Sequence, residues 1–192
     1  MKKGLLIILS GPSGVGKGTL RKKIMKKDDL NLVYSISMTT RQPRNGEIEG
    51  KDYYFVTREE FDKRLKEDSF LEHAEFVGNC YGTPKDKIDE LREQGKNVLL
   101  EIEINGATQV INKVKDEGVI SIFLMPPSLK SLEKRIRKRK SESEDLIKER
   151  LEKGRKEMTM TDAYDYVVVN DSVCRASKEI KKIISSKIAN IE

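Results

Sequence analysis

The chain has 192 residues, of which 36% are hydrophobic and 36% are charged, and its 38 basic and 32 acidic residues give a net charge of +6. This length suits one domain with a buried core, and the apolar stretches fall short of the roughly 20 residues that span a bilayer. The basic excess favours anionic partners such as nucleotides, but interspersed acidic residues argue against nucleic acid.

The first predicted element is a strand at residues 5–9 (LLIIL), followed by the segment GPSGVGKGT at residues 11–19 and a helical pattern over 17–27. A glycine-rich segment between a strand and a helix, with Gly-Lys at its end, is the pattern of a phosphate-binding loop. Its backbone N–H groups and the helix N-terminus would hold phosphate oxygens, and Lys17 would reach the β- and γ-phosphates. We therefore assign ATP binding to Gly11, Pro12, Ser13, Gly14, Val15, Gly16, Lys17, Gly18 and Thr19.

The loop departs from the usual pattern at Gly18, which takes the place of a Ser or Thr whose hydroxyl normally binds magnesium. The departure argues against a GTPase that anchors the metal through its loop. It resembles the Gly-Lys-Gly-Thr of nucleoside monophosphate kinases, in which Mg²⁺ is held mainly through phosphate oxygens and water. The Thr19 hydroxyl would either contact a phosphate or cap the helix, and the sequence leaves both open.

The segment at 35–83 interrupts the rhythm of strands and helices with turn residues and aromatics. Half-buried strand patterns at 52–56 and 70–77 flank a helical pattern at about 58–68, which indicates a small mixed lobe inserted into the core. Two arginines in this lobe flank a turn and would fork onto one phosphate, which three hydroxyls would also bind. The arginines are Arg41 and Arg44, and the hydroxyls belong to Ser37, Tyr53 and Tyr81.

The remainder of the chain alternates continuous apolar runs with helical patterns, which predicts an α/β fold with a parallel sheet flanked by helices. The expected strands are 97–104, 119–124 and 166–169, and the expected helices are 84–94, 106–116, 128–140, 144–160 and 172–189. Residues 134–155 are too polar for a core and indicate an arginine-rich helical flap. We interpret Glu101 as a charge at the rim of the sheet. The two cysteines, Cys80 and Cys174, are far apart and indicate reduced thiols in a cytoplasmic protein.

These motifs together resemble the guanylate kinase family over essentially the whole chain. The resemblance rests on the loop and on SISMTTRQPRNGEIEGKDYYFV, FLEHAEFVGNCYGTPK, LLEIEINGA, PPS, the arginine flap and VVVND. It implies a P-loop core with an inserted GMP-binding lobe and a helical lid, and transfer of phosphate from MgATP to GMP, with dGMP as a further acceptor. We expect the core at 1–35, 86–125 and 158–192, the lobe at 36–85 and the lid at 126–157.

The resemblance also implies roles for single residues. Glu72 and Thr83 would bind guanine, whose N1–H and 2-amino group are adjacent donors, so Glu72 would discriminate against adenine. Glu103 takes the place of a usual aspartate near GMP and the magnesium waters, and Lys140 takes the place of a usual glycine in the flap. Phosphate contacts from the lid and adenine contacts after the last strand are implied for Arg135, Arg139, Arg150 and Asn170.

Three rival functions remain to be weighed against this one. A guanylate-kinase-like scaffold domain would keep the fold as an interaction surface, but such domains generally have degraded phosphate loops, whereas Lys17 is present here. A kinase for another base would conflict with Glu72 and Thr83. A nucleic-acid-binding protein would need aromatics interleaved with its basic residues, and the flap lacks them. The sequence does not distinguish a monomer from a homodimer.

Overall fold

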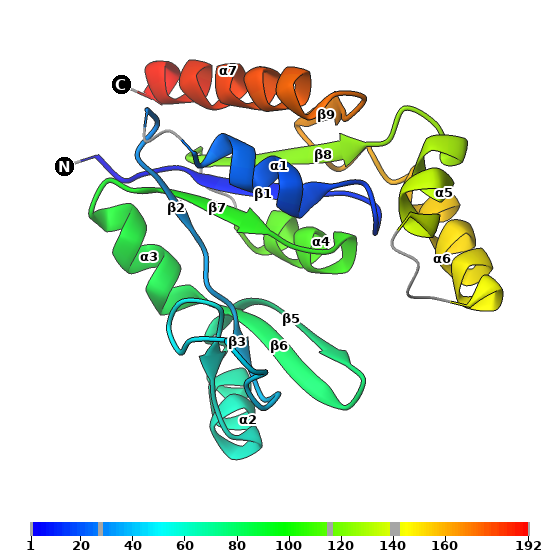
Figure 1. Cartoon of the computed structure of the whole chain (residues 1–192). Coiled ribbons are helices and arrows are strands. Elements are labelled where there is room, and N and C mark those ends of the chain that lie inside the picture. Colours follow the sequence, from blue (N-terminus) through cyan, green and yellow to red (C-terminus); the bar gives the residue numbers. More distant parts are fainter. Residues whose placement is uncertain (1, 27–28, 115–116, 139–142, 192) are drawn as a thin grey trace.

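The computed structural model describes residues 2–26, 29–114, 117–138 and 143–191 (Figure 1). Its larger sheet has the strand order β2-β7-β1-β8-β9, and all neighbours in it run parallel. Its strands are β1 (Leu6–Ser10), β2 (Leu32–Tyr34), β7 (Asn97–Glu101), β8 (Val119–Met125) and β9 (Tyr166–Val169). The predicted α/β fold with a parallel sheet is therefore confirmed.

Helices cover both faces of this sheet, with α1 (Lys17–Ile24) and α7 (Val173–Ile191) on one face and α3 (Lys85–Glu93) and α4 (Ile104–Lys113) on the other (Figure 1). The side chains of β1 and the residue before it show why. Leu5, Ile7 and Leu9 pack with α1 and α7, whereas Leu6 and Ile8 pack with α3 and α4. Because successive side chains of a strand point to opposite faces, an uninterrupted apolar run is buried on both.

The second sheet has the order β4-β3-β6-β5 and mixes parallel and antiparallel pairs. Its strands are β3 (Met38–Thr39), β4 (Tyr54–Phe55), β5 (Phe70–Phe76) and β6 (Asn79–Pro84), and α2 (Arg58–Lys66) packs on it. The Thr57 side chain caps α2 by accepting a hydrogen bond from the Glu60 amide. Phe61 of α2 stacks on Phe70 of β5 with ring centroids 4.5 Å apart, which anchors the helix to the sheet.

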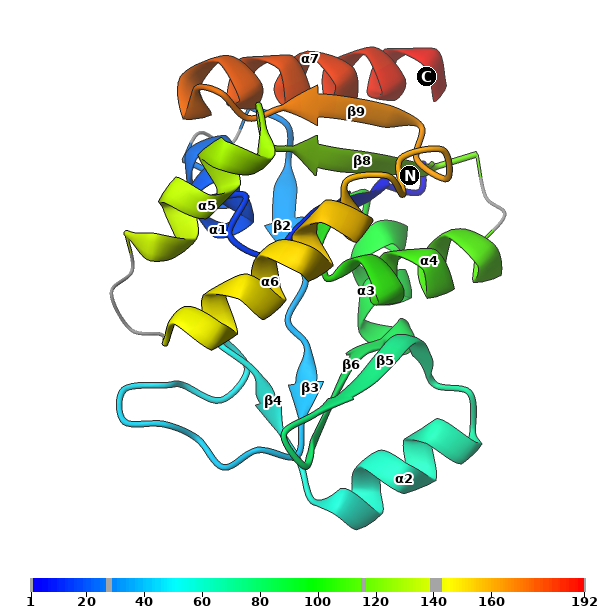
Figure 2. The same ribbon diagram turned by 90° about the vertical axis from the view of Figure 1, so that its right-hand side faces the viewer.

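A pair of helices, α5 (Leu129–Arg137) and α6 (Glu144–Glu157), lies beyond the carboxyl ends of the core strands (Figure 1). Leu132 and Ile136 of α5 form a small apolar cluster with Ile147 of α6. Figure 2 views the molecule from this end, and in both views α6 lies above the second sheet. These helices fall within the range expected for the lid, and the second sheet falls within the range expected for the lobe. The exact division of the chain into core, lobe and lid stays a prediction.

Several element boundaries differ from the predicted ones. The strand expected at 97–104 ends at Glu101, and α4 begins at Ile104, because the backbone of Glu103 already forms the N-cap of that helix. The short strands β2 and β3 were not predicted, since two or three residues carry too little periodicity to mark a strand. The six-residue β6 was also missed; it contains Gly82 and ends at Pro84, which are typical of turns. No helix in the described part of the chain is both long and apolar enough to cross a membrane.

Asn97 fixes the start of the core sheet. Its side chain is buried, and its Oδ1 accepts a hydrogen bond from the Leu5 amide at 2.8 Å. Its Nδ2 donates to the Leu30 carbonyl at 2.7 Å. One amide side chain therefore satisfies a buried donor before β1 and an acceptor in the segment that leads into β2.

We predict that Asn97→Ala lowers the free energy of unfolding by about 1–3 kcal/mol, because it leaves the Leu5 amide buried without its partner. Urea unfolding followed by circular dichroism measures the change. Asn112→Ala, on the exposed side of α4, is the matched control and should stay within about 0.5 kcal/mol of the parent. Equal stability of the two variants would contradict this account.

Candidate active site

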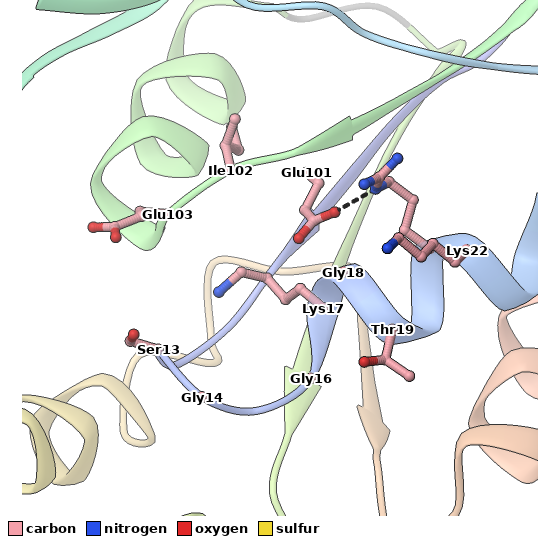
Figure 3. A pocket seen from close by; sticks show the side chains of 11 residues that line it. Ser13, Gly14, Gly16, Lys17, Gly18, Thr19, Lys22, Glu101, Ile102 and Glu103 are labelled. Carbon is pink, nitrogen blue, oxygen red and sulfur yellow. Dashed lines mark hydrogen bonds and ion pairs between the residues drawn. The ribbon is translucent and has the colours of Figure 1, made fainter. Parts of the chain in front are cut away.

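The phosphate-binding loop leaves β1 and enters α1 through Gly16, which has φ 102° and is the N-cap of the helix. A positive φ of this size is adopted readily by glycine and rarely by other residues, so the loop depends on it. The loop forms one side of a cavity of about 550 Å³ (Figure 3). Three residues of the loop itself, Gly11, Pro12 and Val15, are buried. The cavity is lined by Ser13, Gly14, Gly16, Lys17, Gly18, Thr19, Arg21, Lys22, Glu101, Ile102 and Glu103.

Lys17 points from the loop toward the end of β7, on the side where Glu101 and Glu103 lie (Figure 3). Its Nζ donates to the carbonyl of Gly11 at 2.5 Å. Burial lowers the pKa of Lys17, and the negative charges of Glu101, Glu103 and Glu157 oppose this effect. The ammonium group is therefore held at the loop by the Gly11 carbonyl, in the position where it would meet an anionic ligand.

The structure leaves room for a side chain at position 18. A Cβ there would lie 3.5 Å from Glu101 Oε1, which is an ordinary van der Waals contact, and the other oxygen of that carboxylate accepts a hydrogen bond from Arg21 Nε at 2.8 Å. The Thr19 side chain is exposed and lines the cavity, and both roles considered for its hydroxyl stay predictions.

A second cavity, of about 440 Å³, lies between the second sheet and the core. It shares Glu101, Ile102 and Glu103 with the first cavity, so the end of β7 forms a common wall. The side chains that the sequence assigned to acceptor binding and that line this cavity are Ser37, Tyr53, Glu72, Tyr81 and Glu103. Two ligands bound in these cavities would therefore meet at Glu101 and Glu103, at the carboxyl end of β7.

Glu72 is the buried carboxylate of the second cavity, with 7% of its surface exposed. Thr83 Oγ1, which is fully buried, donates a hydrogen bond of 2.6 Å to Glu72 Oε1. Burial raises the pKa of Glu72, and the Thr83 hydrogen bond opposes this shift. The two residues lie on the adjacent strands β5 and β6, and Glu72 lines the cavity whereas Thr83 is buried behind it and does not.

Helix α4 holds Glu72 in place through two contacts. A Cβ on Gly106 would lie 2.7 Å from Glu72 Oε2, so only glycine lets the carboxylate approach the helix this closely. One turn further along, Gln109 bonds both backbone groups of His73: Oε1 accepts from the amide at 3.1 Å, and Nε2 donates to the carbonyl at 3.0 Å. The core thereby fixes the position of a side chain that belongs to the second sheet.

The two arginines assigned to the acceptor phosphate have different surroundings. Arg41 Nη2 donates to Glu47 Oε1 at 2.8 Å, and its guanidinium carbon lies 5.5 Å from the ring centroid of Tyr53, a residue of the second cavity. Arg44 is exposed, and its backbone amide donates to Glu47 Oε2 at 2.8 Å. These contacts hold the pKa of Glu47 below its usual value. Neither arginine is among the described residues that line the cavity.

The lid arginines contact the phosphate loop directly. Arg135 Nη1 donates to the Val15 carbonyl at 2.7 Å, and Nη2 donates to the Asn170 carbonyl at 2.5 Å. The Asn170 side chain also donates to the Val15 carbonyl, at 2.8 Å, so Asn170 is buried behind the loop. Arg150 Nη2 donates to Ser13 Oγ at 2.7 Å. Arg139, like Lys140, lies outside the described residues.

Four further residues belong to the site and were missed by sequence reasoning. Arg21 pairs with Glu101, which lines both cavities instead of being a simple charge at the sheet rim. Lys153 lines the second cavity, and the carboxylate of Glu157 lies near Lys17. Arg21 follows Lys17 by four residues on one helix, which is a signal of a shared face. Lys153 and Glu157 offer no comparable signal in a segment so rich in charge.

Comparisons with known proteins agree with this geometry. The family model described as guanylate kinase matches residues 3–187. The chain is 51% identical over 184 residues to a guanylate kinase of Mycoplasma capricolum, with 96% of this chain and 61% of that protein covered. It is 54% identical over 183 residues to a guanylate kinase of Bacillus cereus, with 95% and 88% covered.

Among solved structures, the chain is similar to the crystal structure of guanylate kinase from Anaplasma phagocytophilum. The TM-score is 0.73 and the sequence identity 36%, with 97% of this chain and 87% of that chain covered. The match of the family model over nearly the whole chain, together with these identities, shows that the chain belongs to the guanylate kinase family.

Proposed function

We propose that this chain is a guanylate kinase that transfers the γ-phosphoryl group of ATP to GMP, forming ADP and GDP, and that it also accepts dGMP. In this reaction the bond from the γ-phosphorus to the β–γ bridging oxygen breaks, and a bond to a phosphate oxygen of GMP forms. The proposal rests mainly on one observation: a phosphate-loop cavity and a cavity with a buried carboxylate share the wall formed by residues 101–103. Membership of the family supports it.

On the donor side, the amides of the loop and Lys17 would bind the ATP phosphates, and Asn170 would support the loop from behind. Arg135 and Arg150 donate to neutral loop groups, and the phosphates would offer charged acceptors for these guanidinia instead. We propose that Arg139 joins them. Phosphoryl transfer asks little covalent chemistry of the protein, so alignment of the two nucleotides in line and stabilisation of charge would supply the catalysis.

On the acceptor side, the Glu72 carboxylate would accept hydrogen bonds from guanine N1–H and the 2-amino group, while Thr83 orients it. Ser37, Tyr53 and Tyr81 would bind the GMP phosphate together with Arg41 and Arg44. For this, Arg41 would exchange its contact with Glu47 for the more highly charged phosphate. Glu103 would lie near the acceptor at the wall between the cavities.

Magnesium would accompany ATP. Among the described residues, no group of three or more His, Cys, Asp or Glu side chains could hold a metal ion, and Gly18 offers no hydroxyl. Mg²⁺ keeps several waters and binds phosphate oxygens readily, so a site with few protein ligands fits it. Glu101 and Glu103 line the phosphate cavity and would accept hydrogen bonds from metal-bound water. When bound, the metal would neutralise charge on the β- and γ-phosphates.

We further propose that the lobe at 36–85 and the lid at 126–157 close on the core when both nucleotides bind. Closure would exclude water, which would otherwise accept the phosphoryl group. We place the protein in the cytoplasm, where its nucleotide substrates are found, and expect neither nucleic acid nor membrane as a partner.

The acceptor specificity is tested by measuring ADP release from MgATP with GMP, dGMP, AMP, CMP or UMP. We expect turnover with GMP and dGMP, and a kcat/KM for AMP lower by a factor on the order of 10⁴, because adenine would leave the buried carboxylate without its donors. No turnover with GMP would refute the enzymatic proposal. Equal rates with AMP would refute the role of Glu72.

The role of Glu72 is tested by Glu72→Gln, which places an amide donor where guanine also presents donors. We expect kcat/KM for GMP to fall by a factor on the order of 100, with little change in the affinity for ATP. Glu67→Gln, at the exposed C-terminal end of α2 and outside both cavities, is the matched control. A parallel loss of ATP affinity would show that the residue acts elsewhere.

The pH dependence of GMP use follows from the same carboxylate. Burial raises the Glu72 pKa above its usual 4.5, and only the charged form accepts both guanine donors. We therefore expect kcat/KM for GMP to be full above this raised pKa and to fall as the pH drops through it. In Glu72→Gln the part of this decline that comes from Glu72 should disappear. The part that comes from titration of the GMP phosphate should be the same in both enzymes. An unchanged limb in the variant would contradict the assignment.

A further inference from the structure

Helix α6 carries a charged face that is directed at both cavities. Arg150, Lys153 and Glu157 follow one another at spacings of three and four residues, which places them on one side of the helix. Another face packs on α5: Ile147 joins the apolar cluster of Leu132, and a Cβ on Gly154 would lie 2.8 Å from that leucine's Cδ2. Since α5 fixes the rotation of α6, the charged face cannot turn away from the site.

Lys153 is the member of this face that lies between the two acidic groups. Its Nζ donates to Glu103 Oε2 at 3.4 Å, and the same nitrogen lies 3.7 Å from Glu157 Oε1. Glu103 lines both cavities, and Lys153 itself lines the second one. A single ammonium group on α6 thus connects the wall of the acceptor cavity to a carboxylate beside the phosphate loop.

Glu157 carries this connection to the loop. It is 9% exposed, and its Oε2 has no hydrogen-bond partner among the residues that the structure describes. Burial raises its pKa, whereas Lys153, Lys17 and a hydrogen bond from the Ser13 amide lower it. Ser13 and Lys17 both belong to the phosphate loop, and Ser13 Oγ also accepts from Arg150 on the same helix face. The carboxylate of Glu157 therefore lies close to the loop groups that would bind the ATP phosphates, on a helix whose Arg150 contacts the loop directly.

We propose that Lys153 is a positioning residue that couples the occupancy of the two cavities, an inference that rests on the proposed function. A phosphate on the loop would compete with Glu157 for the Ser13 amide and for the charge of Lys17. Once the phosphate is bound, Lys153 is the cation that balances the charge of Glu157. Because Lys153 also contacts Glu103, this change in pairing reaches the second cavity, which Glu103 lines. Without Lys153, Glu103 and Glu157 would repel each other, and Lys17 would be the remaining cation that the two carboxylates share.

The test measures this coupling directly in the full chain. The affinity for GMP is determined by calorimetry with and without a non-hydrolysable ATP analogue and Mg²⁺, and the ratio of the two affinities is the coupling factor. Lys153→Met keeps the length of the side chain and removes its charge. Because the pair with Glu103 is partly exposed, we expect the coupling factor to fall by about fivefold, which is the upper range for such pairs.

Two variants separate this role from a structural one. Lys153→Arg should restore most of the coupling, and Lys156→Met, an exposed lysine on the same helix and outside both cavities, should leave it unchanged. An unaltered coupling factor in Lys153→Met, or an equal loss in Lys156→Met, would overturn the inference. Failure of the unmodified chain to bind GMP or the ATP analogue would instead overturn the proposed function, so the two failures are distinguishable.

Discussion

The parallel arrangement of β1 and β7 is the constraint on which the rest of the site depends. The two strands are neighbours, with Leu9 opposite Glu101, so their carboxyl ends leave the sheet at the same edge. The phosphate loop follows β1 and the carboxylates follow β7, and parallel pairing brings these segments face to face. Both cavities use this edge, so one short segment, residues 101–103, lines both of them.

Several acidic and basic side chains meet at this edge, beside the phosphate loop. Lys17 is half-buried, which lowers its pKa, and the charges of Glu101, Glu103 and Glu157 oppose this effect only in part. Glu101 is neutralised by Arg21, which also lies 4.0 Å from the Tyr34 ring centroid, and Glu103 by Lys153. Arg21 and Lys153 are therefore already paired with carboxylates, and a phosphate bound to either cation would exchange one anionic partner for another. Such an exchange costs less than the burial of an unpaired charge.

In the second cavity, the residue that we propose binds guanine is held by parts of the fold to which it does not belong. Glu72 lies on a strand of the second sheet, but its place is fixed by Thr83 on the next strand and by Gly106 and Gln109 on a core helix. The two hydrogen bonds between the Gln109 side chain and the His73 backbone restrain movement of the second sheet relative to the core. This link gives the second sheet a defined position relative to the loop, which two ligands reacting at one edge require.

The amino-acid sequence by itself determined the fold class, the place of the glycine-rich loop between β1 and α1, and several of the residues that line the two cavities. Continuous apolar runs specify strands buried on both faces, and the spacing of glycines with Lys17 specifies the loop, because both signals are local. Short strands such as β3 escaped prediction, since β3 pairs with β6, which is distant in the chain. The tertiary structure alone decided which charges meet. Glu101 with Arg21, Glu103 with Lys153, and Glu157 with the phosphate loop are separated by 80, 50 and more than 100 residues, and only packing of the helices on the sheet brings these pairs together.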